Sequence, residues 1–137
     1  MITAFFDGGA RANPGPAGYG VYIVGDDGQV LAELSGSLGI ATNNIAEYNG
    51  LLAALRYANE HGHRIVRIKS DSELLVKQMI GQYRVKNAGL QALFQQAQSL
   101  ARTLERVAYE HVRREQNKDA DRLANQAMDE GTRTPSP

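Results

Sequence analysis

The chain has 137 residues, of which 42% are hydrophobic and 22% charged, a composition typical of one soluble folded domain. Lys and Arg total 15 and Asp and Glu total 15, so the net charge is zero, which argues against tight non-specific binding to nucleic acid. The absence of cysteine excludes disulfides, thiolate metal sites and a cysteine nucleophile. No apolar stretch approaches the roughly 20 residues of a membrane span and no signal pattern is present, so we expect a cytoplasmic protein with no membrane partner.

Three strands and a helix are expected in the first half of the chain. Short segments rich in β-branched and aromatic residues predict the strands: 2–6, 18–25 and 29–38. The sequence Gly-Asp-Asp-Gly at 25–28 predicts a tight turn that joins the second and third strands as a hairpin. Apolar residues at helical spacing predict a helix over 43–60, with Thr42 as its N-cap and Gly62 at its end.

The second half alternates between strands and helices. We expect a strand over 64–71, helices over 72–80 and 88–104, a strand over 107–114 and a helix over 117–129. This order predicts an α/β fold: a five-stranded mixed sheet, with three antiparallel strands and then two parallel ones, covered by helices. The domain is expected to cover 1–130, and 131–137 to form a loose tail because it has no apolar side chain to bury.

Four acidic residues stand where strands end or helices begin: Asp7, Glu47, Asp71 and Asp121. Taken singly, each has an ordinary structural explanation as a turn residue, a helix cap or a favourable charge near a helix N-terminus. If they converge, their mutual repulsion favours a bound cation, and oxygen ligands without cysteine select Mg²⁺ or Mn²⁺. About four acids can hold two such ions roughly 4 Å apart, an arrangement suited to phosphodiester hydrolysis.

Four segments around these acids resemble ribonuclease H of type 1, and they follow that family's order over nearly the whole chain. The segments are DGGARANPGPAGYG (7–20), TNNIAEYNGLLAAL (42–55), SDSELLVKQMIGQYRVKN (70–87) and HVRREQNKDADRLANQA (111–127). The resemblance implies a ribonuclease H-like fold and hydrolysis of the RNA strand of an RNA/DNA hybrid, leaving a 3′-hydroxyl and a 5′-phosphate. It also implies that the four acids are the catalytic, metal-binding carboxylates, with Asp7 bridging two Mg²⁺ ions that Mn²⁺ can replace.

The resemblance further implies a set of contacts to the hybrid. The residues expected to make them are Gly8, Gly9, Asn13, Thr42, Asn43, Asn44, Ser72, Arg113, Arg114 and Asn117. Asn side chains suit this task because a 2′-hydroxyl, which distinguishes RNA from DNA, needs a partner that can donate and accept. Without the family, a turn at 13–15 and a helix entry at 42–44 would explain the same polar residues.

The chain departs from many family members in two places. The segment between Val112 and Asp121 has no histidine, so we expect Arg113 or Arg114 to supply the charge there, and His111 to be an ordinary strand residue. The passage from 81 to 90 has no room for a basic protrusion, which implies weak hybrid binding with a shallow salt dependence.

Two other functions remain open, and nothing indicates an obligate dimer, so we expect a monomer. The chain could be a DNA-processing or RNA/RNA-cleaving nuclease on the same fold, since a fold does not determine its substrate. A hybrid-binding module without activity is a third class, but it would be expected to have lost one or more of the acids.

Overall fold

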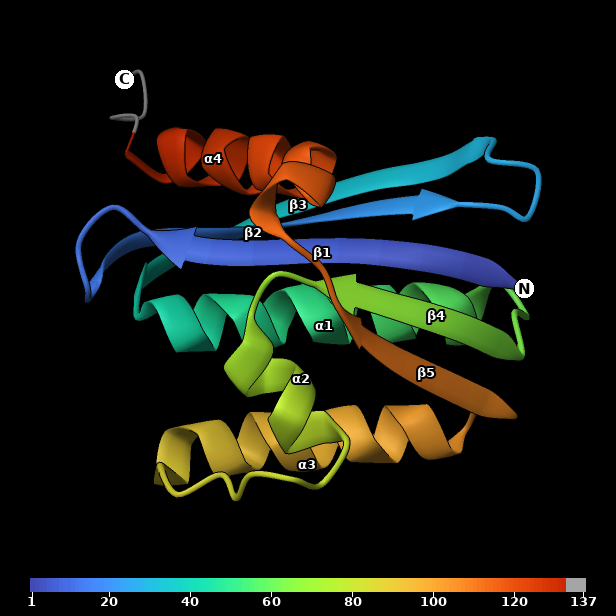
Figure 1. Ribbon diagram of the computed structural model, residues 1–137. Coiled ribbons are helices and arrows are strands. Elements are labelled where there is room, and N and C mark those ends of the chain that lie inside the picture. Colours follow the sequence, from blue (N-terminus) through green and yellow to red (C-terminus); the bar gives the residue numbers. More distant parts are fainter. Residues whose placement is uncertain (133–137) are drawn as a thin grey trace.

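Five strands form one mixed sheet, and helices cover both of its faces (Figure 1). The computed structural model describes residues 1–132. The strands are β1 (Ile2–Ala10), β2 (Gly15–Val24), β3 (Val30–Ala41), β4 (Ile65–Ser70) and β5 (Arg106–His111). They lie in the order β3-β2-β1-β4-β5, antiparallel from β3 to β1 and parallel from β1 to β5, which confirms the expected α/β sheet.

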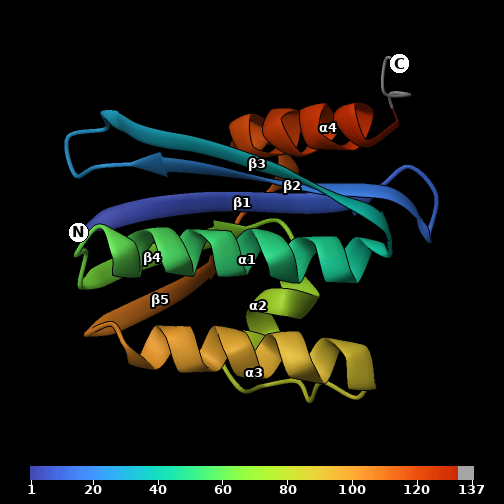
Figure 2. The same ribbon diagram turned by 180° about the vertical axis from the view of Figure 1, so that it is seen from behind.

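The helices divide between the two faces of the sheet. They are α1 (Asn43–Glu60), α2 (Glu73–Met79), α3 (Ala88–Arg102) and α4 (Lys118–Thr132), and a short 3₁₀ turn at Arg114–Gln116 precedes α4. Helix α1 packs on β1 and carries α3 beside it, whereas α4 packs on β2 (Figure 2). No helix in the described part of the chain is long and apolar enough to cross a membrane.

The main core lies between the sheet and α1. Alternate side chains of β1, namely Ile2, Ala4 and Phe6, are buried there together with Leu51 and Leu55 of α1. Because successive strand residues face opposite sides of a sheet, the intervening residues of β1 face the side that α4 covers. Asp7 is one of them.

Local sequence signals mark the ends of α1 and the hairpin as expected. The Thr42 hydroxyl accepts a hydrogen bond from the Ile45 amide at 3.3 Å, and Gly62, with φ of +74°, follows the end of the helix. In the hairpin, the Gly28 amide donates to the Gly25 carbonyl at 3.0 Å.

One boundary changes the description of the site. β1 continues to Ala10, so the expectation that Asp7 ends this strand is wrong. Residues 7–10 pair with 17–20 of β2, and this ladder outweighs the low strand propensity of the glycines. The other boundaries shift by three residues or fewer. Helix α4 runs to Thr132, past the expected start of the tail, and 133–137 lie outside the described residues.

Candidate active site

An open cleft forms where β1 extends beyond the end of its neighbour β4. β1 pairs with β4 only from Ile2 to Phe5, and β4 ends at Ser70, while β1 continues to Ala10. The cleft has a volume of about 790 Å³, and all four predicted carboxylates line it. Its other lining residues are Gly8, Gly9, Ala10, Arg11, Asn43, Ser72, His111, Val112, Arg113, Arg114, Glu115, Asn125 and Met128. The cleft lies at the carboxyl ends of the parallel strands, where ligands bind in α/β sheets.

Asp7 and Glu47 are brought together by a close contact between β1 and α1. A Cβ placed on Gly8 would lie 2.3 Å from the carbonyl carbon of Ala46 and 2.4 Å from the Glu47 nitrogen. Only glycine allows the strand and helix backbones to approach so closely. The Gly8 amide also donates to Asp7 Oδ1 at 2.9 Å, which restricts the orientation of this carboxylate.

Asp121 approaches Asp7 on the face of the sheet that α4 covers, opposite α1. Asp7 pairs with Gly20 of β2, and a Cβ on Gly20 would lie 2.5 Å from the Ala120 carbonyl oxygen. The first turn of α4 therefore rests on the sheet directly beside Asp7. Within that turn Asp121 faces the cleft.

Asn117 holds Asp71 in place by a hydrogen bond. Its side chain is 1% exposed, and its Nδ2 donates to the Phe6 carbonyl at 2.9 Å and to Asp71 Oδ1 at 3.5 Å. Asp71 follows β4, so Asn117 joins the β1 and β4 sides of the cleft. Contact between Asn117 and substrate stays a prediction; in this structure its side chain is buried and contacts Phe6 and Asp71.

Burial and mutual repulsion raise the pKa of two of the carboxyls. The pKa of Asp7 is raised to about 8, first by burial and then by the Asp71 charge and the Asp121 carboxyl, against a lowering by the Gly8 amide. The pKa of Glu47 is raised to about 7, mainly by burial, although a hydrogen bond from Ser72 lowers it. A divalent cation would relieve this repulsion.

The donor set fits Mg²⁺ better than a metal that needs a closed protein cage. Among residues 1–132, no three acidic or histidine side chains are arranged to enclose a cation by themselves. Mg²⁺ keeps several waters and is bound through one or two carboxylates together with phosphate oxygens, so it does not need such a cage. Asp7, Glu47, Asp71 and Asp121 are the residues that would hold such an ion, and substrate oxygens would complete its ligand set.

The predicted substrate-binding residues fall into two groups. Gly8, Gly9, Asn43, Ser72, Arg113 and Arg114 line the cleft, whereas Asn13, Thr42 and Asn44 do not. Asn13 lies next to Asn43, because its Oδ1 accepts a hydrogen bond from the Asn43 amide at 3.0 Å. Thr42 caps α1, and Asn44 is exposed in its first turn.

Seven cleft residues lie outside the predicted site residues, and four of them, Arg11, His111, Asn125 and Met128, have side chains of functional interest. Arg11 and Asn125 were not considered, although Asn125 lies one helical turn after Asp121, a spacing that places both on one face. Met128 continues the same face of α4. His111 was expected to be an ordinary strand residue; it is the last residue of β5, exposed, and lines the cleft.

Comparison with known proteins agrees with this fold. Residues 5–127 match the family model described as "Reverse transcriptase-like". The chain is 50% identical over 124 residues to the "Bifunctional protein Rv2228c" of Mycobacterium tuberculosis, covering 90% of this chain but only 34% of that protein. It is 39% identical over 129 residues to "Ribonuclease HI" of Halobacterium salinarum, covering 94% of this chain and 65% of that protein. The chain thus spans only part of the length of these curated relatives.

A solved structure matches nearly the whole chain. LC11-RNase H1, solved in complex with an RNA/DNA hybrid, has a TM-score of 0.92 and 38% sequence identity, and the match covers 97% of this chain and 100% of that one. At this identity and coverage, similarity extends beyond the fold to the sequence of the whole domain. The chain belongs to the ribonuclease H family of type 1.

Proposed function

We propose that this chain is an endoribonuclease that hydrolyses the RNA strand of RNA/DNA hybrids with two divalent metal ions, leaving 3′-hydroxyl and 5′-phosphate ends. The observation that carries the proposal is the meeting of four carboxylates, from β1, α1, α4 and the segment that follows β4, in one open cleft. Family relatives named as ribonuclease H, one of them solved with a hybrid, support the same substrate.

The four carboxylates differ in their place within the cleft. Asp7 is central, since it interacts with both Asp71 and Asp121, and Glu47 lies on the Asp71 side. Mg²⁺ or Mn²⁺ bound here would activate the attacking water and stabilise the leaving oxygen. The acids must be ionised to hold the cation, so the raised pKa values of Asp7 and Glu47 couple metal binding to proton release.

The polar residues around the cleft suit a nucleic-acid duplex. Asn43 Oδ1 accepts from the Ala10 amide at 2.8 Å, and Asn13 Oδ1 accepts from the Asn43 amide, so both side-chain oxygens are used within the protein. A ligand would therefore meet their amide N–H groups, which can donate to a 2′-hydroxyl or a base edge. The exposed Arg113 and Arg114 would meet phosphate groups.

Cleavage assays distinguish this function from the other two. Labelled RNA/DNA hybrid, RNA duplex and DNA duplex would each be incubated with Mg²⁺, Mn²⁺ or EDTA. We expect cutting of the RNA strand of the hybrid with either metal and none with EDTA. Preferential cutting of DNA or of RNA duplex would instead identify another nuclease, and binding without cutting would identify a hybrid-binding module.

Replacing one carboxylate tests the role of the acids. Asp71→Asn keeps an oxygen for the hydrogen bond from Asn117 but removes the charge, so the fold should persist. We expect cleavage to fall by at least about 1,000-fold, as in other sites that lose an essential electrostatic group. Hybrid affinity, measured by fluorescence anisotropy, should stay within about 3-fold because other groups make most of the contacts. Undiminished cleavage would refute the assignment.

A cytoplasmic location and a monomeric state were also expected from the sequence and stay predictions. Sedimentation velocity would test the monomeric state.

A further inference from the structure

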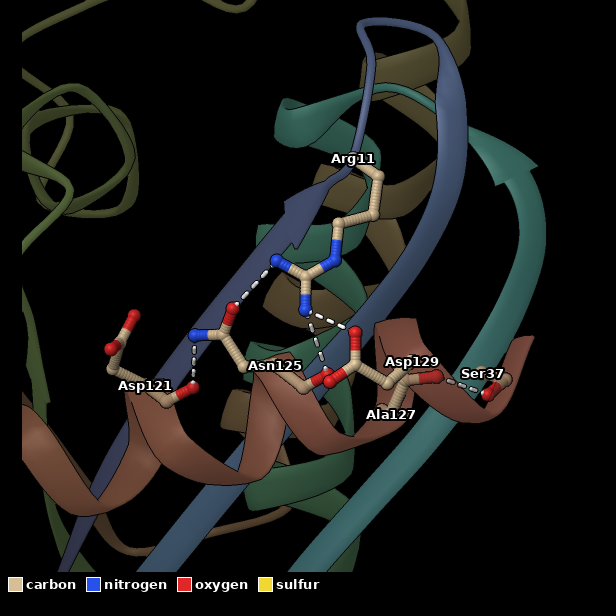
Figure 3. A network of polar contacts seen from close by, with 6 residues as sticks. All are labelled: Arg11, Ser37, Asp121, Asn125, Ala127 and Asp129. Carbon is tan, nitrogen blue, oxygen red and sulfur yellow. Dashed lines mark hydrogen bonds and ion pairs between the residues drawn. The ribbon is translucent and has the colours of Figure 1, made fainter. Parts of the chain in front are cut away.

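Arg11, which directly follows β1, joins this end of the strand to helix α4 (Figure 3). Its Nη1 donates to Asn125 Oδ1 at 2.9 Å, and its Nη2 donates to the Asn125 carbonyl at 3.3 Å and pairs with Asp129. The side chain is 41% exposed and lines the cleft. One guanidinium thus contacts three oxygens on two successive turns of the helix.

Arg11 contacts the same face of α4 that carries Asp121. Asp121, Asn125 and Asp129 are spaced by four residues, so they follow one another along one side of the helix. Asn125 Nδ2 also donates to the Asp121 carbonyl at 2.9 Å. In Figure 3 this chain of contacts runs from Arg11 through Asn125 to the turn that holds Asp121.

Two other side-chain contacts of α4, among the described residues, lead to a different strand. Ser37 Oγ donates to the Ala127 carbonyl, and Arg122 pairs with Glu33, so both contacts join α4 to β3. Arg11 instead joins α4 to the end of β1, the strand that carries Asp7. This end of β1 is also held to α1, because Asn43 Oδ1 accepts from the Ala10 amide.

We propose that Arg11 is a positioning residue that sets the placement of Asp121 relative to Asp7 and thereby the affinity of the cleft for divalent metal. The proposal rests on the proposed function. The fork geometry of arginine is essential to it, since a planar guanidinium can contact the Asn125 amide and the Asp129 carboxylate together, whereas an ammonium group offers one point charge.

The test compares Arg11→Met and Arg11→Lys with Arg122→Met as a matched control. Arg122 is a similarly exposed arginine, 53% exposed, that pairs α4 with Glu33 of β3 and does not line the cleft. Mn²⁺ binding to the substrate-free protein would be measured by electron paramagnetic resonance. Mg²⁺ titration of hybrid cleavage and the KM for hybrid would be measured alongside.

For Arg11→Met we expect the Mn²⁺ dissociation constant and the Mg²⁺ midpoint to rise about 10-fold, as for other residues that orient metal ligands, with KM nearly unchanged. Arg11→Lys should bind metal nearly as weakly as Arg11→Met, because lysine keeps the positive charge but lacks the planar guanidinium. Arg122→Met should change metal affinity by less than about 2-fold, since exposed ion pairs contribute little.

Two outcomes would overturn the proposal. A raised KM with unchanged metal affinity would make Arg11 a phosphate contact, and an equal loss in Arg122→Met would mean that any loosening of α4 suffices. The Mn²⁺ measurement needs no substrate, so weaker binding by Arg11→Met would support the positioning role even if wild-type protein failed to cut hybrids.

Discussion

At the scale of single residues, burial and two neighbouring acids, Asp71 and Asp121, make the Asp7 carboxyl difficult to ionise. Its pKa of about 8 means that the folded protein without metal holds this proton far more tightly than the unfolded chain does, where an Asp titrates near 3.8. Below about pH 4 both states are protonated and the difference vanishes. As the pH rises from about 4 through about 8, the unfolded chain loses the proton first, so stability falls. Glu47, with a pKa of about 7, adds to this fall.

Asp7→Asn should therefore stabilise the metal-free protein while abolishing cleavage. We expect a gain of about 1–2 kcal/mol in the free energy of unfolding at pH 9, typical of replacing a strained functional residue, and little gain at pH 4. Urea unfolding in EDTA at both pH values measures it. Asp27→Asn, in the exposed hairpin turn, is the control and should show no such pH dependence. An Asp7→Asn protein no more stable than the control at pH 9 would contradict the argument.

At the scale of elements, two helices approach the sheet closely because glycines of β1 and β2 face them. Gly8 lets α1 rest on β1, and Gly20 lets α4 rest on β2 beside Asp7. The carboxylates are carried by these elements, so their spacing depends on how closely the backbones approach. A small shift of either helix would move Glu47 or Asp121 away from Asp7.

Gly20→Ala tests this dependence. Its new methyl group would lie 2.5 Å from the Ala120 carbonyl oxygen and from Leu123 Cβ, so α4 must move outward. We expect a loss of about 1–3 kcal/mol in the free energy of unfolding, from overpacking, together with a fall in kcat. Gly25→Ala is the control, because its closest contact is the exposed Asp27 side chain at 3.2 Å, and it should stay within about 0.5 kcal/mol. Equal losses in both variants would refute the close-approach argument.

The same elements show how far sequence reasoning reaches. Periodicity and turn signals predicted every strand and helix, and the family motifs predicted the four acids, because both depend on local patterns. The close approach of Gly8 to Ala46 of α1 could not be predicted, because it is a contact between segments far apart in the chain. The contacts of Asn117 with Phe6 and of Arg11 with Asp129 escape sequence reasoning for the same reason, since each pair is separated by more than 100 residues.

At the scale of the whole molecule, a net charge of zero hides a local arrangement of charge at the cleft. The described lining residues include Arg113 and Arg114 in the segment between β5 and α4, beside the four acids. The bare acids repel a phosphate backbone, whereas these two arginines attract it. Hybrid binding should therefore depend on few ionic contacts and on bound metal, in agreement with the shallow salt dependence predicted from composition.

Arg113→Gln and Arg114→Gln test whether these two residues carry the ionic contacts. Hybrid affinity would be measured between about 50 mM and about 200 mM salt in the Asp71→Asn background, which prevents cleavage. We expect each change to reduce the slope of log affinity against log salt by about 0.9, the contribution of one phosphate contact. Arg56→Gln, on α1 and outside the cleft lining, is the control and should leave the slope unchanged.

The same pair of substitutions also tests whether an arginine supplies the charge that many family members obtain from a loop histidine. If Arg113 or Arg114 supplies this charge, its replacement by Gln in otherwise wild-type protein should lower kcat by about 10-fold or more. This is the contribution typical of a positioned acid–base or charged group. His111→Gln provides a comparison at the neighbouring cleft position, because it removes the imidazole at the end of β5. If both arginine variants turned over at the wild-type rate while His111→Gln did not, the charge would come from His111, and the loop arginines would serve binding alone.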